Sequence, residues 1–518
     1  MKMHPRVPSF ISVAVCAAFS FAPAPGWAQA GPPLYDDLGA HRYDISTEVP
    51  QAQAYFNQGM RLYYAFNHVE AIRAFNQAEA LDPTCAMCAW GEALARGPNI
   101  NLPMDEANAL AAWGAIERAK TLASAAPAKE RDLVGALAVR YSADAPAERA
   151  ALDSAYAEAM GELVERYGDD DEVLVLYGEA LMDLRPWDYW VSSDRLESSI
   201  AVAVDLFATV RDRAPDHPGA CHFFIHAVEE NQPERAVPCA EHLAGMMPGA
   251  GHLVHMPGHI YIRVGRYDDA IEANRHAVHA DESYIQDQRP GAGMYTLGYY
   301  PHNYDFMAFA ALMAGREETA VEAADRMAEL LPTEMFGTPG MGFLEHWTMR
   351  RIQVRVRFGR WDEILAIPEP GAELAHARAL WHYGRGRALA ATGRIDEAGR
   401  ELEALRREMM RPETEDLRLE FNPSRAVLAI AEDVLAAHVA SARGDHARAV
   451  AYARAAVDHE TDLLYGEPPE WTVPARQDLG DVLLAAGRLG EARGVFEEDL
   501  SRFPANAWST RGLEAAGG

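Results

Sequence analysis

The chain has 518 residues, of which 49% are apolar and 24% are charged, and its formal net charge is −30. At about 100–200 residues per domain, this length fits two to four domains or one long repeat array. Such an acidic chain repels phosphate groups, so the composition excludes nucleic acid as an expected partner and argues against attraction to an anionic membrane surface.

Residues 1–30 have the layout of a secretory signal peptide. Lys2 and Arg6 precede an apolar run, FISVAVCAAFSFA, and the segment ends in WAQA. The run is too short to cross a bilayer, and no later segment reaches about 18 uninterrupted apolar residues. We therefore expect an exported chain, periplasmic or secreted, with no membrane span. A lead-in segment containing proline and glycine follows at 31–50.

A helix–turn–helix repeat follows this lead-in, in residues 51–100. Gly59 is followed twelve residues later by Ala71, and then by Phe75 and Pro83. This spacing is typical of a tetratricopeptide-like unit of about 34 residues. In such a unit, small residues let two antiparallel helices approach closely, and the proline ends the second helix.

The same spacing recurs along the chain, where later second helices open on Ala270, Ala320 and Ala492. Many of the expected turns contain a glycine followed by arginine or aspartate: Gly265, Gly315, Gly359, Gly393, Gly444 and Gly487. Few segments alternate apolar and polar residues as strands would. The predicted fold class is therefore all-α, a TPR-like α-solenoid of helix–turn–helix hairpins.

The weaker and stronger copies divide the remaining chain into four expected segments. These are diverged helical hairpins at 101–215, His-rich hairpins at 216–335, TPR-like hairpins at 336–460, and a C-terminal repeat with its cap at 461–518. A repeat scaffold by itself specifies no function, so a function has to be argued from a site. The His-rich hairpins are the segment that offers one.

Histidines lie at regular offsets on the first helix of one repeat. His252, His255 and His259 precede Ala270 by 18, 15 and 11 residues. Because an α-helix turns by about 100° per residue, these three side chains share one narrow face. Gly258 points away from that face, toward the paired helix.

Neighbouring repeats carry matching side chains. His302 and Asp305 precede Ala320 by 18 and 15 residues. His222 and His226 fit the same register if one residue is missing from their turn. Because packed helices lie about 8–10 Å apart, we expect side chains from successive first helices to converge.

The convergence predicts a transition-metal site. Its candidate ligands offer imidazole or carboxylate groups: His222, His226, His252, His255, His259, His302 and Asp305. Imidazole binds zinc, copper, iron and nickel, and its predominance here favours copper or zinc, with iron left open. These ligands suffice for one metal with spare partners or for two metals. No catalytic residue follows from the sequence, so enzyme activity stays open.

Two functions fit this pattern. One is a metal-binding protein or metalloenzyme; the other is a non-catalytic scaffold whose concave groove holds an extended peptide or protein partner. A metal site needs imidazoles at about 2.0–2.1 Å from one point, whereas a groove tolerates dispersed rings. Structural hydrogen bonding is the third interpretation, and we expect it for the isolated histidines: His217, His242, His276 and His279.

Side chains near the histidines are candidate walls for a small-molecule substrate or a peptide: Trp187, Tyr299, Tyr300, Tyr304, His346 and Arg476. Aromatic residues at turns between repeats more often serve packing. His346 lies one repeat beyond the histidine cluster, 18 residues before Ile364. Arg476 follows a proline-rich loop that enters the last repeat.

Four cysteines remain after the leader: Cys85, Cys88, Cys221 and Cys239. No histidine follows Cys88, so the c-type haem signature is absent. For Cys85 and Cys88 a local disulfide, a buried thiol pair and a soft-metal or redox pair are the alternatives. Cys221 and Cys239 face each other across one hairpin, although a disulfide needs a closer Cα approach than usual helix packing. No Gly-rich phosphate loop is present, so no nucleotide cofactor is expected.

The runs PDHPGACHFFIHAVE, AGHLVHMPGHIYIRVGRYDDAIEAN, YYPHNYDF and EPPEW resemble a group of exported bacterial tetratricopeptide-repeat proteins. The likeness covers residues 50–515. In that group the position of Gly258 is commonly Ser and that of Asp305 is often His. The resemblance implies the repeat fold, export and the histidine pattern, and it implies no particular reaction.

Overall fold

The computed structural model describes residues 31–336, 338 and 340–517, so the expected leader peptide at 1–30 lies outside the described residues. The described chain forms two compact units, divided between Asn303 and Tyr304. We call residues 31–303 the N-terminal unit and residues 304–517 the C-terminal unit. Across these described ranges no helix is both long and apolar enough to cross a membrane.

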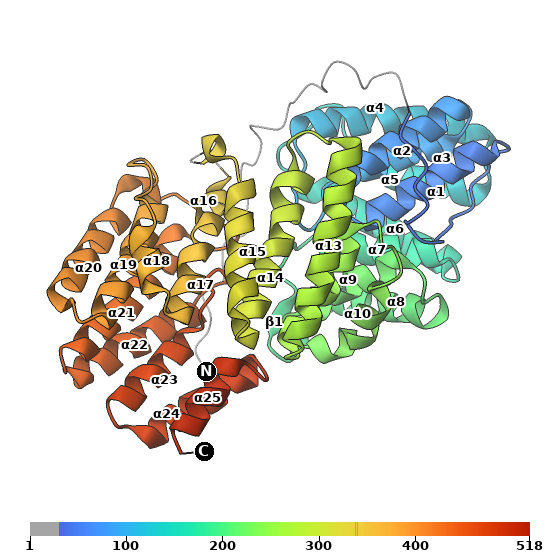
Figure 1. The fold of residues 1–518 in the computed structure, drawn as a ribbon. Helices are drawn as coiled ribbons and strands as arrows, with labels where there is room; N and C mark the ends of the chain where they lie inside the picture. Colours follow the sequence, from blue (N-terminus) through green and yellow to red (C-terminus); the bar gives the residue numbers. More distant parts are fainter. Residues whose placement is uncertain (1–30, 337, 339, 518) are drawn as a thin grey trace. The chain divides into compact units, whose positions relative to one another are not determined.

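The N-terminal unit is built from helices and one small pair of strands (Figure 1). In chain order these are α1 (Pro50–Tyr64), α2 (His68–Leu81), α3 (Ala86–Ala95), α4 (Glu106–Leu122), η1 (Ala123–Ala125), α5 (Ala128–Ala138), α6 (Ala150–Tyr167), α7 (Asp171–Asp183), β1 (Trp190–Ser192), β2 (Arg195–Leu196), α8 (Ser198–Arg213), α9 (Pro218–Val228), η2 (Pro233–Ala236), α10 (Val237–Leu243), α11 (Gly251–His255), α12 (Pro257–Arg263), α13 (Tyr267–Gln288) and the π-helical turn η3 (Tyr295–Tyr299). The next helix, α14 (Tyr300–Ala314), contains the division between the units.

The C-terminal unit continues with helices alone among its described elements (Figure 1). These are α15 (Glu317–Leu330), η4 (Thr333–Met335), α16 (Gly342–Thr348), α17 (Arg350–Phe358), α18 (Trp361–Ala366), α19 (Ala375–Ala391), α20 (Ile395–Met409), η5 (Pro412–Thr414), α21 (Ser424–Ala442), α22 (His446–Thr461), α23 (Ala475–Ala485), α24 (Leu489–Arg502) and α25 (Ala507–Ala515).

Consecutive helices pack as helix–turn–helix hairpins, among them α1 with α2, α19 with α20, α21 with α22, and α23 with α24. The first and last of these share one packing device. A Cβ atom at Gly59 would lie 2.5 Å from the Phe75 ring, and one at Gly480 would lie 2.2 Å from the Phe496 ring. Because the ring occupies the space of a side chain, only glycine permits these approaches. The all-α, TPR-like fold expected from the sequence is confirmed.

The turns between these helices also follow the sequence. The six glycines predicted at turns have positive φ angles between 71° and 79°, a left-handed conformation that glycine adopts without steric cost. They are Gly265, Gly315, Gly359, Gly393, Gly444 and Gly487. The prediction of turns at these positions is confirmed.

Two local features differ from the sequence expectation. The diverged segment contains an antiparallel strand pair, β1 and β2, whose turn is closed by a 2.7 Å hydrogen bond from Ser192 to Asp194. The single helix expected through the later histidines is divided into α11 and α12, because Pro257 has no N–H to donate. Met256 between them keeps helical angles, φ −50° and ψ −36°, so the helix direction continues and the register of the histidines is kept.

Long-range packing brings distant parts of the N-terminal unit together. Helix α1 packs on α9, and α11 and α12 pack on α13. The end of α1 and the loop after it therefore lie beside the first His-rich helix. The candidate site is built at this junction.

Candidate metal centre

The structure brings six histidines together inside the N-terminal unit: His222, His226, His252, His255, His259 and His302. They come from α9, α11, α12 and the start of α14. The first five are only 0–3% exposed, and His302 is partly buried. The ring centroids of neighbouring histidines lie 4.8–6.4 Å apart. The rings thus form a continuous interior cluster instead of lining an open surface.

Nitrogen atoms of this cluster approach closely enough to share a cation. In one set, His222, His226 and His252 each offer a ring nitrogen within 4.8 Å of the others. In a second set, His255, His259 and His302 do the same. We call these sets the first triad and the second triad.

A main-chain contact orients His222 in the first triad. Its Nδ1 lies 2.6 Å from the carbonyl oxygen of Tyr64, at the end of α1. A carbonyl only accepts, so Nδ1 carries the ring proton and Nε2 presents its lone pair. That Nε2 lies 3.2 Å from Nε2 of His252.

A side-chain amide orients His255 in the second triad. Its Nδ1 lies 2.7 Å from Oδ1 of Asn274, and the amide nitrogen of Asn274 donates to the carbonyl of Ala270 at 2.8 Å. The second bond fixes the amide, so its oxygen accepts the proton of His255 Nδ1. Nε2 of His255 then presents its lone pair 2.9 Å from Nε2 of His259.

Glu229 lies between the two triads, and the sequence analysis did not identify it. Its Oε2 lies 3.5 Å from Nδ1 of His226 and 3.1 Å from Nδ1 of His259. Its side chain is fully buried, yet neither of its oxygens has a hydrogen-bond partner among the described residues. Neither ring nitrogen of His226 has one there either. The spacing of three residues between His226 and Glu229, one helix turn, is the signal that could have revealed this carboxylate.

The protonation state of the rings suits metal binding. Burial lowers the pKa of four of them well below the ordinary value of 6.5, and the neighbouring histidines lower it further: His222, His226, His252 and His255. These rings are therefore neutral near pH 7. A neutral imidazole is the form that binds a metal.

Aromatic side chains cover the first triad. The ring centroid of Phe66 lies 4.4 Å from that of His222, Trp187 lies 5.3 Å from His226, and Tyr299 lies 4.5 Å from His252. Asn101 joins two of them, because it accepts from the Trp187 indole at 3.2 Å and donates to the Tyr299 hydroxyl at 3.3 Å.

Two residues of this aromatic wall have strained backbones. Phe66 and Trp187 have positive φ angles of 55° and 62°, which bulky residues rarely adopt. Tyr299 ends the π-helical turn η3. Such backbone features cluster at functional sites. Trp187 and Tyr299 were predicted to lie beside the histidines, and they do; Phe66 carries no signal in the sequence because its place depends on the packing of α1 on α9.

Other candidate wall residues make contacts of their own. The Tyr300 hydroxyl donates to Glu282 at 3.1 Å. Tyr304 belongs to the C-terminal unit, where it is hydrogen-bonded to Arg326. Arg476 lies in the same unit, with its Nε 2.9 Å from Glu498.

Asp305, a candidate ligand from the sequence, is ion-paired within the C-terminal unit. Arg350 donates to both of its oxygens, at 2.9 and 3.1 Å. The same guanidinium donates to the carbonyl of Glu470 at 2.8 Å. The cation that Asp305 meets is therefore an arginine, and we do not include Asp305 in the proposed ligand set.

His346 also lies in the C-terminal unit, in a buried chain of hydrogen bonds. Its Nε2 lies 2.8 Å from the carbonyl of Glu470, and its Nδ1 lies 2.9 Å from Nε2 of His376. Nδ1 of His376 lies 2.8 Å from the hydroxyl of Ser424. Each ring nitrogen of His346 and His376 has a hydrogen-bond partner, so the contacts of His346 are those of a structural residue.

A further cluster in the N-terminal unit joins His41, Glu172 and His217. Oε1 of Glu172 lies 2.6 Å from Nε2 of His41 and 3.6 Å from Nε2 of His217, and its Oε2 accepts from the Tyr64 hydroxyl. Nδ1 of His217 accepts from the N–H of Ala220, so the proton of the neutral ring lies on Nε2. Burial alone would raise the pKa of Glu172, but the two histidines hold it well below its usual range. Oε2 of Glu172 is thus hydrogen-bonded, but its Oε1 and the Nε2 atoms of His41 and His217 have no hydrogen-bond partner among the described residues, so these three side chains could also hold a cation.

The four cysteines form two pairs at bonding distance. The Sγ atoms of Cys85 and Cys88 lie 2.05 Å apart, and those of Cys221 and Cys239 lie 2.20 Å apart. The Cα atoms of the second pair lie only 5.1 Å apart, closer than the usual separation of packed helices. Sulfur atoms bonded to each other are not available as metal ligands.

The chain matches no family model, and it matches no curated protein. Among solved structures it is similar to yeast Tom70, with 11% identity, a TM-score of 0.29, and 91% of this chain and 96% of that chain covered. It is also similar to a human IFIT1 dimer with m7Gppp-AAAA, with 11% identity, a TM-score of 0.29, and coverages of 88% and 91%.

Proposed function

We propose that the N-terminal unit binds a transition metal through the two triads and Glu229. The observation that carries this proposal is the buried Glu229 carboxylate, which lies between two imidazoles and has no hydrogen-bond donor among the described residues. A buried charge without a partner costs several kcal/mol, so native proteins pair such groups or use them to bind cations. A metal ion would supply the missing charge.

The distances within the triads fit this assignment. Two nitrogens bound to one tetrahedral metal at about 2.0–2.1 Å lie about 3.3–3.4 Å apart, and at a right angle they lie about 2.9 Å apart. The observed separations are 3.2 Å between His222 and His252, and 2.9 Å between His255 and His259. His222 and His255 are also held by oxygen atoms behind them, as metal-bound histidines usually are.

The donor set favours zinc or copper and leaves iron open, because it consists of six imidazoles and one carboxylate. A metal bound here would supply Lewis-acid or redox chemistry. The chain's own residues would then orient the imidazoles and exclude water, and Phe66, Trp187 and Tyr299 would form the adjoining wall.

The alternative of an extended peptide held against the histidines has less support. A peptide groove requires accessible side chains, whereas the five histidines of α9, α11 and α12 are at most 3% exposed. A peptide would have to displace the aromatic wall to touch them. A buried metal requires no such opening once it is bound.

Elemental analysis by mass spectrometry tests the proposal. The full chain would be purified without chelators or a histidine tag, together with H259A and the matched control H276A. His276 is a surface residue that lies 2.8 Å from Glu272, and its side chain is 64% exposed. We expect about one or two metal ions per chain in the wild type and in H276A, and a clear loss in folded H259A. Wild-type protein that retains no zinc, copper or iron after reloading would contradict the proposal.

We also propose that the chain is exported, to the periplasm or the medium. The layout of residues 1–30 and the two cysteine pairs support this, because disulfides persist mainly in oxidising compartments. Fractionation of cells that express the full chain, followed by N-terminal sequencing, tests it. We expect a mature protein in the exported fraction that begins close to Gly31; an uncleaved cytoplasmic chain would contradict export.

A further inference from the structure

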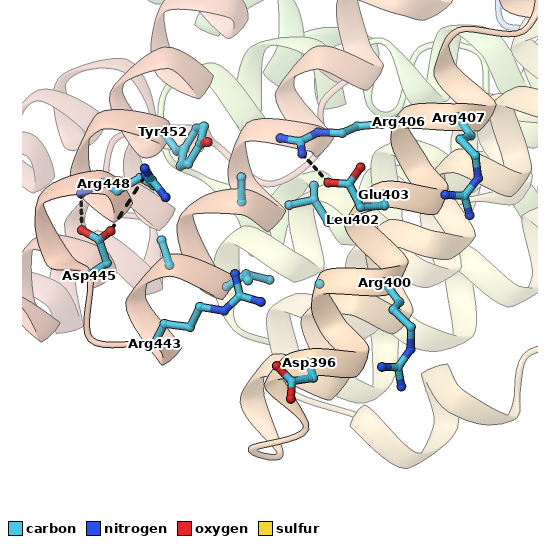
Figure 2. Close-up of a pocket in the computed structure, with 14 residues that line it drawn as sticks. Asp396, Arg400, Leu402, Glu403, Arg406, Arg407, Arg443, Asp445, Arg448 and Tyr452 are labelled. Atoms are coloured by element: carbon cyan, nitrogen blue, oxygen red, sulfur yellow. Dashed lines mark hydrogen bonds and ion pairs between the residues drawn. The ribbon is translucent and has the colours of Figure 1, made fainter.

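A second candidate site lies in the C-terminal unit, in a pocket between α20, α21 and α22 (Figure 2). Its volume is about 570 Å³, within the range of small-molecule sites, which is about 300–1,000 Å³. None of its residues belongs to the metal centre. An inference about this pocket is therefore independent of the proposed function.

The pocket is locally positive in a strongly acidic chain. The whole chain has 77 acidic residues against 47 lysines and arginines. Five arginines line the pocket, against three acidic residues. The arginines are Arg400, Arg406, Arg407, Arg443 and Arg448. Acidic partners are abundant in this chain, so the excess of arginine at one place needs an explanation.

The ion pairs around the pocket leave part of this charge uncompensated. Arg406 is neutralised, since it lies 2.6 Å from Glu403 and 2.8 Å from Glu432. Arg448 has only a long contact of 3.9 Å with Asp445. Arg443 makes no side-chain ion pair or hydrogen bond with any described residue. Arg407 likewise makes none with the described residues, and Arg400 has only a 3.8 Å contact with Glu397. Of the five arginines, only Arg406 is closely paired, and the others are free to bind an anion.

Arg443 is placed to do so. It follows the end of α21, and Figure 2 shows its side chain reaching toward α20. A Cβ atom at Gly399 on α20 would lie 3.0 Å from Nη2 of Arg443, so the glycine leaves room for the guanidinium to cross the pocket. Arg448 approaches from α22, and Tyr452 on the same helix adds a hydroxyl group.

The pocket also has an apolar part. Leu402 from α20 and Ala436, Val439 and Ala440 from α21 line it beside the arginines. A guanidinium matches carboxylates and phosphates through paired hydrogen bonds. We propose that this pocket binds a small organic oxyanion, a carboxylate or a phosphate monoester, with its charge on Arg443 and Arg448 and its apolar body on Leu402 and Val439.

Ligand binding to the full chain tests this inference, with phenyl phosphate and 4-phenylbutyrate as probes and benzyl alcohol as the uncharged control. Saturation-transfer NMR would detect binding, and titration would give the dissociation constants. We expect at least one acidic probe to bind and benzyl alcohol to bind far more weakly. Binding of the phosphate alone assigns a phosphate ligand, binding of the carboxylate alone assigns a carboxylate, and binding of neither overturns the proposal.

Variants separate the pocket from the general charge of the surface. R443Q removes an uncompensated guanidinium, and R454Q is the matched control, because Arg454 lies on α22 outside the pocket and pairs with Glu491 at 2.9 Å. We expect R443Q to weaken binding by about tenfold or more, because it removes hydrogen bonds from a charged donor to the anion. R448Q provides a second test if R443Q does not fold. Equal weakening in R443Q and R454Q, or none in both pocket variants, would overturn the proposal.

Discussion

The two units contain buried histidines at similar repeat positions, but they satisfy them differently. In the C-terminal unit, Ser424, His376, His346 and the carbonyl of Glu470 form an unbroken chain at 2.8–2.9 Å, in which neutral rings meet every hydrogen-bonding requirement. In the N-terminal unit, His226 and Glu229 have no hydrogen-bond partners among the described residues. The first arrangement needs nothing further, whereas the second leaves buried polar atoms without partners, which the proposed metal would supply. Histidine spacing alone therefore does not distinguish a structural site from a binding site.

Buried carboxylates show the same contrast. Asp305 in the C-terminal unit meets the guanidinium of Arg350 in a two-pronged contact. Asp281 in the N-terminal unit has neutral partners, accepting from Tyr295 at 2.6 Å and from Asn303 at 2.7 Å. Burial raises the pKa of Asp281 to about 7, although the two hydrogen bonds act to lower it. Asp305 is thus paired with a cation, whereas Asp281 has neutral partners. The difference belongs to these two sites and not to the whole units, since Asp183 of the N-terminal unit is paired with Arg140 at 2.7 Å.

The largest effect is expected when the C-terminal pairing is broken. R350M leaves Asp305 buried without its cation, and removing one partner of a buried pair costs about 3–5 kcal/mol. Thermal unfolding should show a much lower midpoint temperature for R350M than for the wild type. The control R360M removes a half-buried arginine whose partners Glu317 and Glu363 are both exposed, so it should unfold close to the wild type. If R350M and R360M unfold at the same temperature, Asp305 does not depend on Arg350.

A smaller effect is expected when Glu229 is made neutral. E229Q keeps the shape of the side chain but removes the charge that lies beside His226 and His259. Removing the charge of a proposed ligand should weaken metal affinity at least as much as changes to the groups behind the ligands, which typically cost about 10–100-fold. Competition with a chelator of known affinity measures the change. S424A, which removes a partner from the histidine chain of the C-terminal unit, should leave metal affinity unchanged; an equal loss in both variants would contradict the contrast between the units.

The third effect concerns how the stability of the protein depends on pH through Asp281. Its pKa is about 7 in the folded chain and about 3.9 when unfolded, so the folded state holds the extra proton between these values. The protonated Asp281 therefore stabilises the folded state at low pH, and this stabilisation is lost as the pH rises from about 4 to about 7. In that range the free energy of unfolding falls by up to about 1.4 kcal/mol per pH unit. D281N cannot ionise, so its unfolding temperature relative to the wild type should rise between pH 5 and pH 8. Parallel profiles for the two proteins would show that Asp281 does not titrate in this window.

The sequence alone determined the repeat fold and the grouping of the histidines. Small residues at fixed spacing and glycines at turns act locally, so they could be identified without coordinates; Gly59 against Phe75 and the positive φ of Gly265 show this. The offsets of His252, His255 and His259 follow from helix geometry, which Pro257 interrupts without changing the register. The sequence also indicated Trp187 and Tyr299 as neighbours of the histidines.

Only the tertiary structure decided which group supports each ring. The carbonyl of Tyr64 that orients His222 is 158 positions away along the chain, and its place follows from the packing of α1 on α9. The pairing of Asp305 with Arg350 likewise depends on distant packing, so the spacing that predicted candidate ligands also included a residue of an ion pair. Helix periodicity fixes the face of the helix on which a side chain lies. The chemistry of that side chain is set by the atoms that other helices bring to the same face. This is because hydrogen bonds and charges act over a few ångströms in space, whatever the distance along the chain.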